Sequence, residues 1–111
     1  MYEWVKEFPG KITICDREGI IVEMNDRSIK AFEKDGGAGL IGKNMLDCHP
    51  EPARTRLKEL LAAGNTNAYT IEKNSVKKLI YQSPWYHNGV YRGFVEFSLE
   101  IPLTLPHHIR T

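Results

Sequence analysis

Two apolar runs separated by a tight turn open the folded part of the chain. The turn carries Asp16 and Gly19, and the runs lie directly before and after it. An Asp side chain can hydrogen-bond to the backbone of a turn, and Gly supplies the positive φ that a hairpin bulge needs. The pattern predicts a β-hairpin over residues 11–24.

A short helix is predicted next, over residues 26–33. Asn25 or Asp26 can accept the free amide protons of its first turn, and Ile29 and Phe32 repeat at a helical spacing. The glycine-rich segment 34–39 then ends the helix, because closely spaced glycines lose too much backbone entropy in a helical conformation. We expect a flexible loop there.

A longer central helix is predicted between Pro52 and Gly64. Pro is tolerated in the first helical turn, and Gly64 is placed to end the helix in a left-handed conformation. Leu57, Leu60 and Leu61 fall on one face of this helix, which is therefore the face expected to pack against the core.

The last third of the chain predicts strands over residues 67–74, 77–86 and 90–101. The Asn88-Gly89 pair between the last two is a strong hairpin signal. Strands therefore lie at both ends of the pattern and helices only in the middle. This order predicts an α+β fold, with a five-stranded antiparallel sheet and helices packed on one face.

Alternation along the last two strands gives an expectation of which side chains face the helices. We expect Arg92, Phe94, Glu96, Ser98 and Glu100 to face outward, together with Lys78 and Gln82 of the preceding strand. The opposite parity is expected to form the inner face: Leu79, Tyr81, Ser83, Trp85, Tyr91, Gly93, Val95, Phe97, Leu99 and Ile101. The hydroxyls of Tyr81 and Ser83 would then need a partner in protein, water or ligand.

Three segments in this order resemble a PAS domain. They are the hairpin that ends in Asn25, the Leu-Ile-Gly-Lys turn at residues 40–43, and a last strand entered through the Gly89 to Gly93 spacing. The resemblance covers about residues 5–101. It divides the chain into an N-terminal cap segment (1–10), the PAS domain (11–101) and a tail (102–111). Glu100-Ile101-Pro102 departs from the Asp-Ile-Thr with which the family usually launches a signalling helix.

The resemblance implies a sensory module that binds a small molecule in its core cavity and relays a signal through protein–protein contacts. The residues expected to contact the ligand come from the central region and the last two strands: Cys48, His49, Leu57, Tyr81, Ser83, Trp85, Val95 and Phe97. The alternative is a ligand-free interaction and dimerisation domain, whose core is filled by bulky side chains such as Tyr81, Trp85 and Phe97.

The Cys48-His49-Pro50 triplet resembles a PAS subgroup in which these residues precede the central helix. His49 could be the axial ligand of haem in a gas or redox sensor, although the haem-binding subfamily places its histidine within the helix. Cys48 near a helix N-terminus could be a redox-sensitive thiol. In a purely structural interpretation, both residues only fix the turn that leads into the helix. Zinc is not expected, because no second ligand pair exists at zinc spacing, and no Asn-Cys-Arg-Phe-Leu run for covalent flavin attachment occurs.

Composition narrows the class of protein. With 111 residues and a net charge of +1, the chain suits one domain and has no basic footprint for nucleic acid. No apolar run reaches the length of a membrane span, and no signal peptide or catalytic motif is found. We therefore expect a cytoplasmic, non-enzymatic module whose partner is a histidine kinase or a transcription regulator.

The N-terminal segment suggests self-association. Trp4 and Phe8 lie at helical spacing, and Phe94 has outward parity in the last strand. An exposed aromatic on an open sheet normally needs a cover. We expect either a homodimer that uses this segment and the sheet around Phe94, or a monomer in which the segment covers its own sheet.

Overall fold

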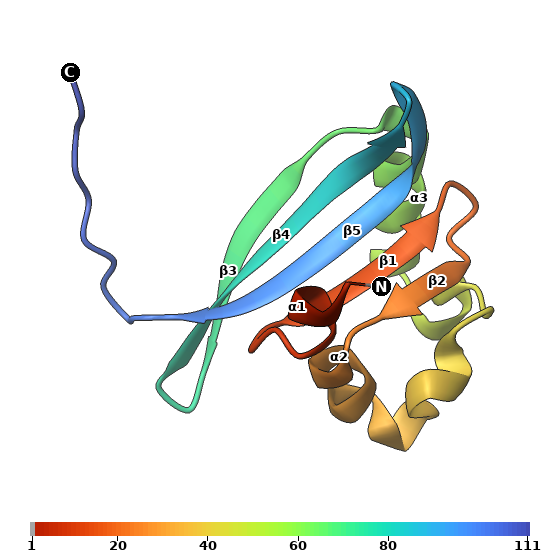
Figure 1. Ribbon diagram of the computed structural model, residues 1–111, viewed down its shortest axis with the longest axis horizontal. Helices are drawn as coiled ribbons and strands as arrows, with labels where there is room; N and C mark the ends of the chain where they lie inside the picture. Colours follow the sequence, from red (N-terminus) through yellow and green to blue (C-terminus); the bar gives the residue numbers. More distant parts are fainter. Residues whose placement is uncertain (1) are drawn as a thin grey trace.

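A twisted antiparallel sheet of five strands forms the centre of the computed structural model, which describes residues 2–111. The strands lie in the order β2-β1-β5-β4-β3, so that the first hairpin pairs with the last strand (Figure 1). All pairings are antiparallel. The predicted fold class and element order are therefore confirmed.

The strands agree closely with the sequence prediction. Their bounds are β1 (Lys11–Asp16), β2 (Ile21–Met24), β3 (Asn67–Lys73), β4 (Val76–His87) and β5 (Val90–Ile101). The β4–β5 turn has Asn88 and Gly89 at positive φ, as the Asn-Gly signal predicted. Residues 102–111 lie outside the helices and strands and lead away from the sheet (Figure 1).

Between β2 and β3 the first helix is shorter than predicted and 3₁₀ turns follow it, whereas the central helix lies between Pro52 and Gly64 as predicted. The segments are α2 (Asp26–Ala31), three 3₁₀ turns η1 (Glu33–Asp35), η2 (Gly37–Leu40) and η3 (Met45–Cys48), and α3 (Ala53–Ala63). The expected caps are present: Asn25 accepts the amide proton of Ser28, and Gly64 ends α3 in the left-handed conformation. The glycine-rich segment is organised in two 3₁₀ turns instead of an irregular loop.

The N-terminal segment forms one short helix, α1 (Glu3–Lys6), in front of the sheet in Figure 1, whereas α3 lies behind it. The side-chain amide of Asn25 holds the end of this segment by donating to the carbonyl of Gly10 at 2.8 Å and to that of Val5 at 3.2 Å. Trp4 does not pack, since 70% of its surface is exposed, whereas Phe8 is half-buried.

The predicted facing of the last two strands is wrong for most of their length. Phe94 and Gln82 are each only 7% exposed and lie on the helix side, whereas Tyr81 is 40% exposed. The strand register determines which residues share a face, because cross-strand neighbours point to the same side. Gln82 lies opposite Glu96, and Tyr81 lies opposite Phe97. Of the aromatic residues predicted to face the helices, Tyr91 alone does so, because an irregularity in the pairing beside Trp85 shifts its parity.

The error has a physical cause. The prediction assigned polar strand residues to the solvent side. Gln82, Glu96 and Ser98 instead belong to the inner face, where Gln82 and Glu96 line a cavity. The outer face in turn carries apolar side chains. Hydrophobic alternation reports the solvent side only when one face alone is apolar.

Candidate functional site

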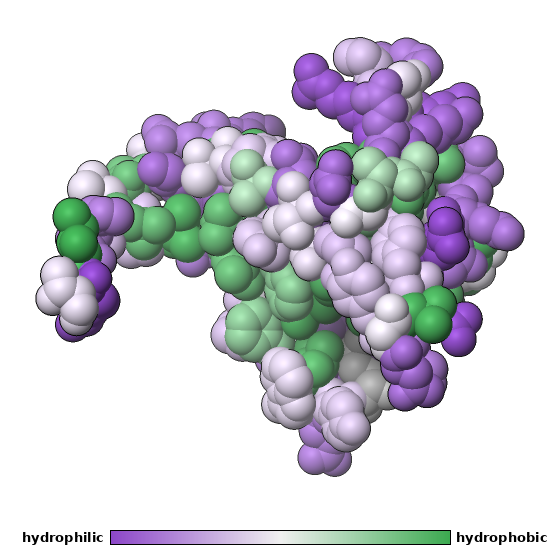
Figure 2. Space-filling view, turned by 90° about the horizontal axis from the view of Figure 1, so that it is seen from above, coloured by the Kyte–Doolittle hydropathy of each residue, from purple (hydrophilic) through white to green (hydrophobic). Residues whose placement is uncertain are grey.

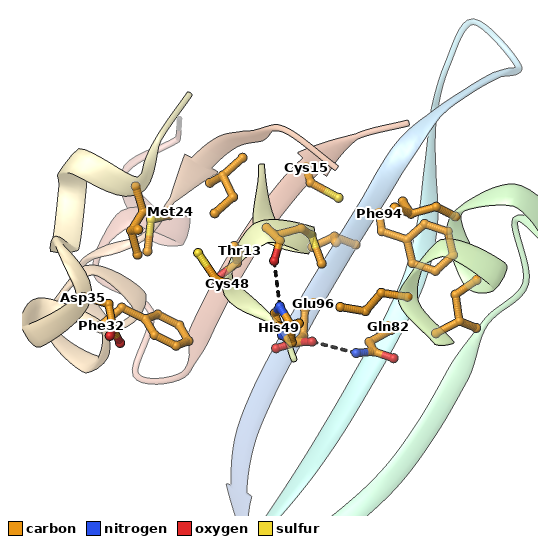
Figure 3. Close-up of a pocket in the computed structure, with 17 residues that line it drawn as sticks. Thr13, Cys15, Met24, Phe32, Asp35, Cys48, His49, Gln82, Phe94 and Glu96 are labelled. Carbon is orange, nitrogen blue, oxygen red and sulfur yellow. Dashed lines mark hydrogen bonds between the residues drawn. The ribbon is translucent and has the colours of Figure 1, made fainter. Parts of the chain in front are cut away.

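A cavity of about 410 Å³ lies between the inner face of the sheet and the helical segments (Figure 3). This volume is in the range of sites that hold small organic ligands. The sheet contributes Thr13, Cys15, Ile21, Met24, Gln82, Phe94, Val95 and Glu96 to its lining. The helical segments contribute Phe32, Asp35, Leu40, Met45, Cys48, His49, Leu57, Leu60 and Leu61.

Most of the wall is apolar and rests on two small buried clusters. One cluster joins Cys15 of β1, Leu61 of α3 and Phe94 of β5. The other consists of Ile21, Met24 and Leu40. Tyr91 closes the first cluster: its hydroxyl donates to the carbonyl of Leu61 at 2.7 Å, and its ring meets Phe94 edge to face. The sheet and the end of α3 are therefore fixed to each other at one end of the cavity.

A polar strip crosses the sheet wall. Asn67 donates to Gln82 Oε1 at 2.9 Å. Gln82 Nε2 in turn donates to Glu96 Oε2 at 2.7 Å (Figure 3). Gln82 is thereby fixed on both sides, which orients the carboxylate of Glu96. Among residues 2–111, Glu96 Oε1 accepts no hydrogen bond, so the strip retains an acceptor.

His49 lines the same cavity from the loop before α3. Its Nδ1 lies 2.7 Å from the carbonyl of Met45 (Figure 3). A carbonyl only accepts, so Nδ1 carries the proton, and Nε2 of the neutral ring is an acceptor. The loop is held by Arg54, whose Nε donates to the carbonyls of Leu46 and His49.

The two cysteines differ in their surroundings. Cys15 is 2% exposed, and burial raises the pKa of its thiol, with smaller opposing contributions from backbone hydrogen bonds. Cys48 is exposed, although it borders the cavity. Cys48 is therefore the thiol that solution reagents can reach.

The structure brings together half of the residues expected to contact a ligand. Cys48, His49, Leu57 and Val95 line the cavity. Tyr81, Ser83, Trp85 and Phe97 do not, because they lie on the other face of the sheet. There the hydroxyl of Ser83 donates to the carbonyl of Pro84, and the indole of Trp85 donates to the carbonyl of Cys15.

Sequence reasoning missed the residues that give the cavity its polarity. Gln82, Glu96 and Thr13 are all polar residues within strands, and they were assigned to solvent or left out. One signal was available. The hairpin at Asn88 and Gly89 sets Gln82 roughly opposite Glu96, and an amide paired with a carboxylate is a plausible interior hydrogen bond.

The lining does not suit haem. Haem carries two carboxylates, yet the cavity is bordered by Asp35 and Glu96 and by no Lys or Arg within residues 2–111. The helix α3 contains no histidine. Nor do the described residues hold any group of three or more His, Cys, Asp or Glu side chains arranged for a metal ion.

Comparisons with known proteins find similarity in structure only. No protein-family profile matches the chain, and no curated protein matches its sequence. Solved structures do match. The Aer2 receptor of Vibrio cholerae, described as a dual PAS-heme oxygen sensor, has 20% identity and a TM-score of 0.60, covering 83% of this chain and 94% of that chain.

Two further structures widen the comparison. A sensory box sensor histidine kinase of Vibrio cholerae has 16% identity and a TM-score of 0.66, covering 92% of this chain and 89% of that chain. The Vibrio cholerae VqmA dimer, a LuxR-type receptor, has 12% identity and a TM-score of 0.67, covering 90% of this chain and 51% of that chain. VqmA has also been solved bound to DPO.

At 12% to 20% identity, these likenesses concern the fold. No described helix is long and apolar enough to cross a membrane. The resemblance drawn from the hairpin, the Gly42 turn and the last strand is thus confirmed at the level of structure: the chain has the fold of a PAS domain.

Proposed function

We propose that the chain is a sensory PAS module that binds a small organic molecule in its cavity and relays occupancy through protein contacts. The cavity of about 410 Å³ with its apolar wall and single polar strip carries this proposal. Sites of this kind give affinity through apolar area and orientation through a few polar groups. No catalytic role is assigned to any residue.

The chemistry of the wall defines the ligand class. Glu96 Oε1 is an acceptor, His49 Nε2 is the ring nitrogen left open by the Met45 contact, and Asp35 adds a second carboxylate at the border. A ligand that donates hydrogen bonds suits this set, whereas a carboxylate or phosphate would be repelled. We propose a molecule with an apolar body and one amine, amide or hydroxyl group.

The alternative of a core filled by its own side chains loses its main support. Tyr81, Trp85 and Phe97 were expected to occupy the interior, and all three lie on the opposite face. Phe32 and Phe94 are the aromatic residues that border the cavity, and they leave its volume open.

The relay surface proposed is the outer face of the sheet. It carries half-buried apolar residues along three neighbouring strands: Ile14, Leu79, Phe97 and Leu99. Figure 2 shows hydrophobic residues on the surface between the centre of the molecule and the C-terminal tail. Because Phe94 faces the cavity, it belongs to the ligand wall and not to this surface.

Two kinds of assembly follow from this surface. One is a homodimer through the outer face, which the VqmA dimer supports as a precedent for this fold. The other is docking on a histidine kinase or transcription regulator, the kinds of protein named among the structural neighbours. The module is proposed to act in the cytoplasm, where its free cysteines stay reduced.

Ligand binding is tested by native mass spectrometry of freshly purified protein, followed by a small-molecule screen using ligand-detected NMR. Leu57→Trp fills the cavity from α3, whereas Lys58→Trp adds the same ring at an exposed neighbouring position. We expect Leu57→Trp to weaken binding by at least about tenfold and Lys58→Trp to leave it unchanged. Equal binding by both variants would place the ligand elsewhere.

Assembly is tested separately by sedimentation. Tyr81→Glu places a charge on the outer face, and Tyr86→Glu places one at an exposed site near the β4–β5 turn. We expect the first variant to shift a dimer toward monomer and the second to have no effect. If the unmodified chain is a monomer, the homodimer is excluded and the outer face would dock on a different protein.

A further inference from the structure

A second hollow of about 460 Å³ lies at the end of β1 where α2 meets the sheet. Cationic side chains from three elements surround it: Lys11 of β1, Arg27 and Lys30 of α2, and Lys78 of β4. Its remaining lining residues are Pro9, Gly10, Ala31, Ser98 and Glu100, and we call the whole set the basic groove. The groove shares no residue with the cavity described above.

The positive charge of the groove is not compensated within the described residues. Glu100 is its one acid, and it lies directly opposite Lys78 in the strand pairing. None of the four cations forms an ion pair within residues 2–111; the nearby Asp26 is paired at 3.9 Å with Lys6 instead. The whole chain has a net charge of only +1, so the positive charge of the groove is a local concentration and not a general property of the surface.

The environment of Lys11 shows the cost of this arrangement. Burial lowers the pKa of its ammonium group, Lys78 lowers it further, and Glu96 opposes both effects. Its Nζ lies 5.5 Å from the centre of the Phe32 ring, which keeps the group oriented beside the sheet. A bound anion would relieve the repulsion between Lys11 and Lys78.

Ser98 is the second observation that points to a ligand. The residue is 5% exposed and lies opposite Lys11 on one side and Ile80 on the other. Its hydroxyl has no hydrogen-bond partner within residues 2–111. Buried hydroxyls are normally satisfied, and this one belongs to the lining of the groove.

We propose that the basic groove binds the phosphoryl group of a phosphorylated small molecule. The hydroxyl of Ser98 donates to a phosphate oxygen, Lys11 and Lys78 supply charge at the sheet, and Arg27 and Lys30 close over the anion from α2. Arg27 can offer two parallel donors to one phosphate, and the lysines act as point charges. The site is independent of the sensory cavity, which favours donors instead of anions.

The probe is pyrophosphate, titrated into the full chain at constant ionic strength and followed by amide chemical shifts. We expect saturable shifts at Lys11 and Ser98. The double variant Lys30→Gln/Lys78→Gln should bind at least about fivefold more weakly, because two of the charges that attract the anion are removed. Ser98→Ala should weaken binding without changing the net charge.

The control is Lys58→Gln/Lys73→Gln, which removes the same charge from exposed positions outside the groove. Unchanged binding in this control supports a defined site. Equal weakening in both double variants, or shifts that do not saturate, would show simple charge screening and overturn the proposal.

A second arm distinguishes the source of the phosphoryl group. Co-sedimentation is measured with phosphatidylcholine vesicles that contain phosphatidylinositol 4-phosphate, with plain phosphatidylcholine vesicles as the control. Binding to the phosphorylated vesicles that is lost in Lys30→Gln/Lys78→Gln assigns the groove to a lipid headgroup. Binding of pyrophosphate without vesicle binding assigns it to a soluble metabolite, and binding of neither overturns the site.

Discussion

The indole of Trp85 donates a hydrogen bond of 3.0 Å to the carbonyl of Cys15, across the strand that separates them. Trp85 lies opposite Gly93 of β5, and Gly93 in turn lies opposite Asp16 of β1. The bond therefore joins the outer face of β4 to β1, whose Cys15 side chain lines the cavity. This hydrogen bond links the wall of the ligand cavity directly to the proposed relay surface.

Gly93 makes this crossing possible, and its replacement should be severe. A Cβ atom there would collide with the carbonyl of Cys15 and the backbone of Asp16, and the residue has φ +152°. We expect Gly93→Ala to lower the free energy of unfolding by about 3 kcal/mol or more, since backbone atoms must move. Urea denaturation measures this.

Gly39→Ala is the matched control, because a Cβ there meets no atom within 4 Å. It should change the free energy of unfolding by less than about 0.5 kcal/mol. A mild effect at Gly93 would mean that β1 and β5 separate easily.

Asn25 should be the most sensitive polar position of the fold. It is fully buried, accepts from the amides of Ile12 and Ser28, and donates to the carbonyl of Gly10. We expect Asn25→Ala to cost about 3 kcal/mol, because several backbone groups lose their partner at once. Thermal and urea unfolding report the loss.

Asn44→Ala serves as its control. Asn44 caps η3 by accepting from Leu46 and donates to the carbonyl of Glu18, but it lies near the surface. Its loss should cost about 1 kcal/mol, as for an ordinary helix cap. A similar cost for both variants would contradict a central role for Asn25.

The fold could be predicted because its signals are local. The turn at Asp16 and Gly19, the cap at Asn25 and the stop at Gly64 each depend on a few neighbouring residues, and each is found as expected. The bounds of β5 agree with the prediction at both ends. Such chemistry acts within one turn of the chain, so alternation and cap residues are enough to locate it.

The site could be predicted only in part, because it depends on which face of the sheet is inward. Cys48, His49 and Leu57 were found from their place before and in the central helix. Gln82 and Glu96 were missed because a ligand cavity needs polar groups inside, which reverses the usual pattern. The irregular pairing beside Trp85 then shifts the parity of Tyr91, and no local signal marks it.

Two buried serines should respond in opposite directions to the same substitution. Ser28 shares a hydrogen bond of 2.6 Å with Thr13, whereas the hydroxyl of Ser98 has no partner within residues 2–111. Ser28→Ala leaves Thr13 unpaired and should cost about 1 to 2 kcal/mol. Ser98→Ala removes an unsatisfied group and should raise the free energy of unfolding by about 1 kcal/mol.

Both serine variants are compared by urea denaturation in phosphate-free buffer. Adding pyrophosphate should stabilise the unmodified chain and Ser28→Ala more than Ser98→Ala, because only the last lacks the donor in the basic groove. A loss of stability in Ser98→Ala without any anion would show that its hydroxyl is already satisfied.

The two thiols should differ sharply in reactivity. Cys48 is exposed, whereas Cys15 is 2% exposed and burial raises the pKa of its thiol, so at pH 8 less of Cys15 is present as the reactive thiolate. We expect iodoacetamide to modify Cys48 at least about tenfold faster, as read by peptide mass spectrometry. Unfolding in guanidinium should make the two rates similar, which controls for intrinsic reactivity. Equal rates in the folded protein would mean that β1 opens readily and that the cavity wall at Cys15 is reached by solvent.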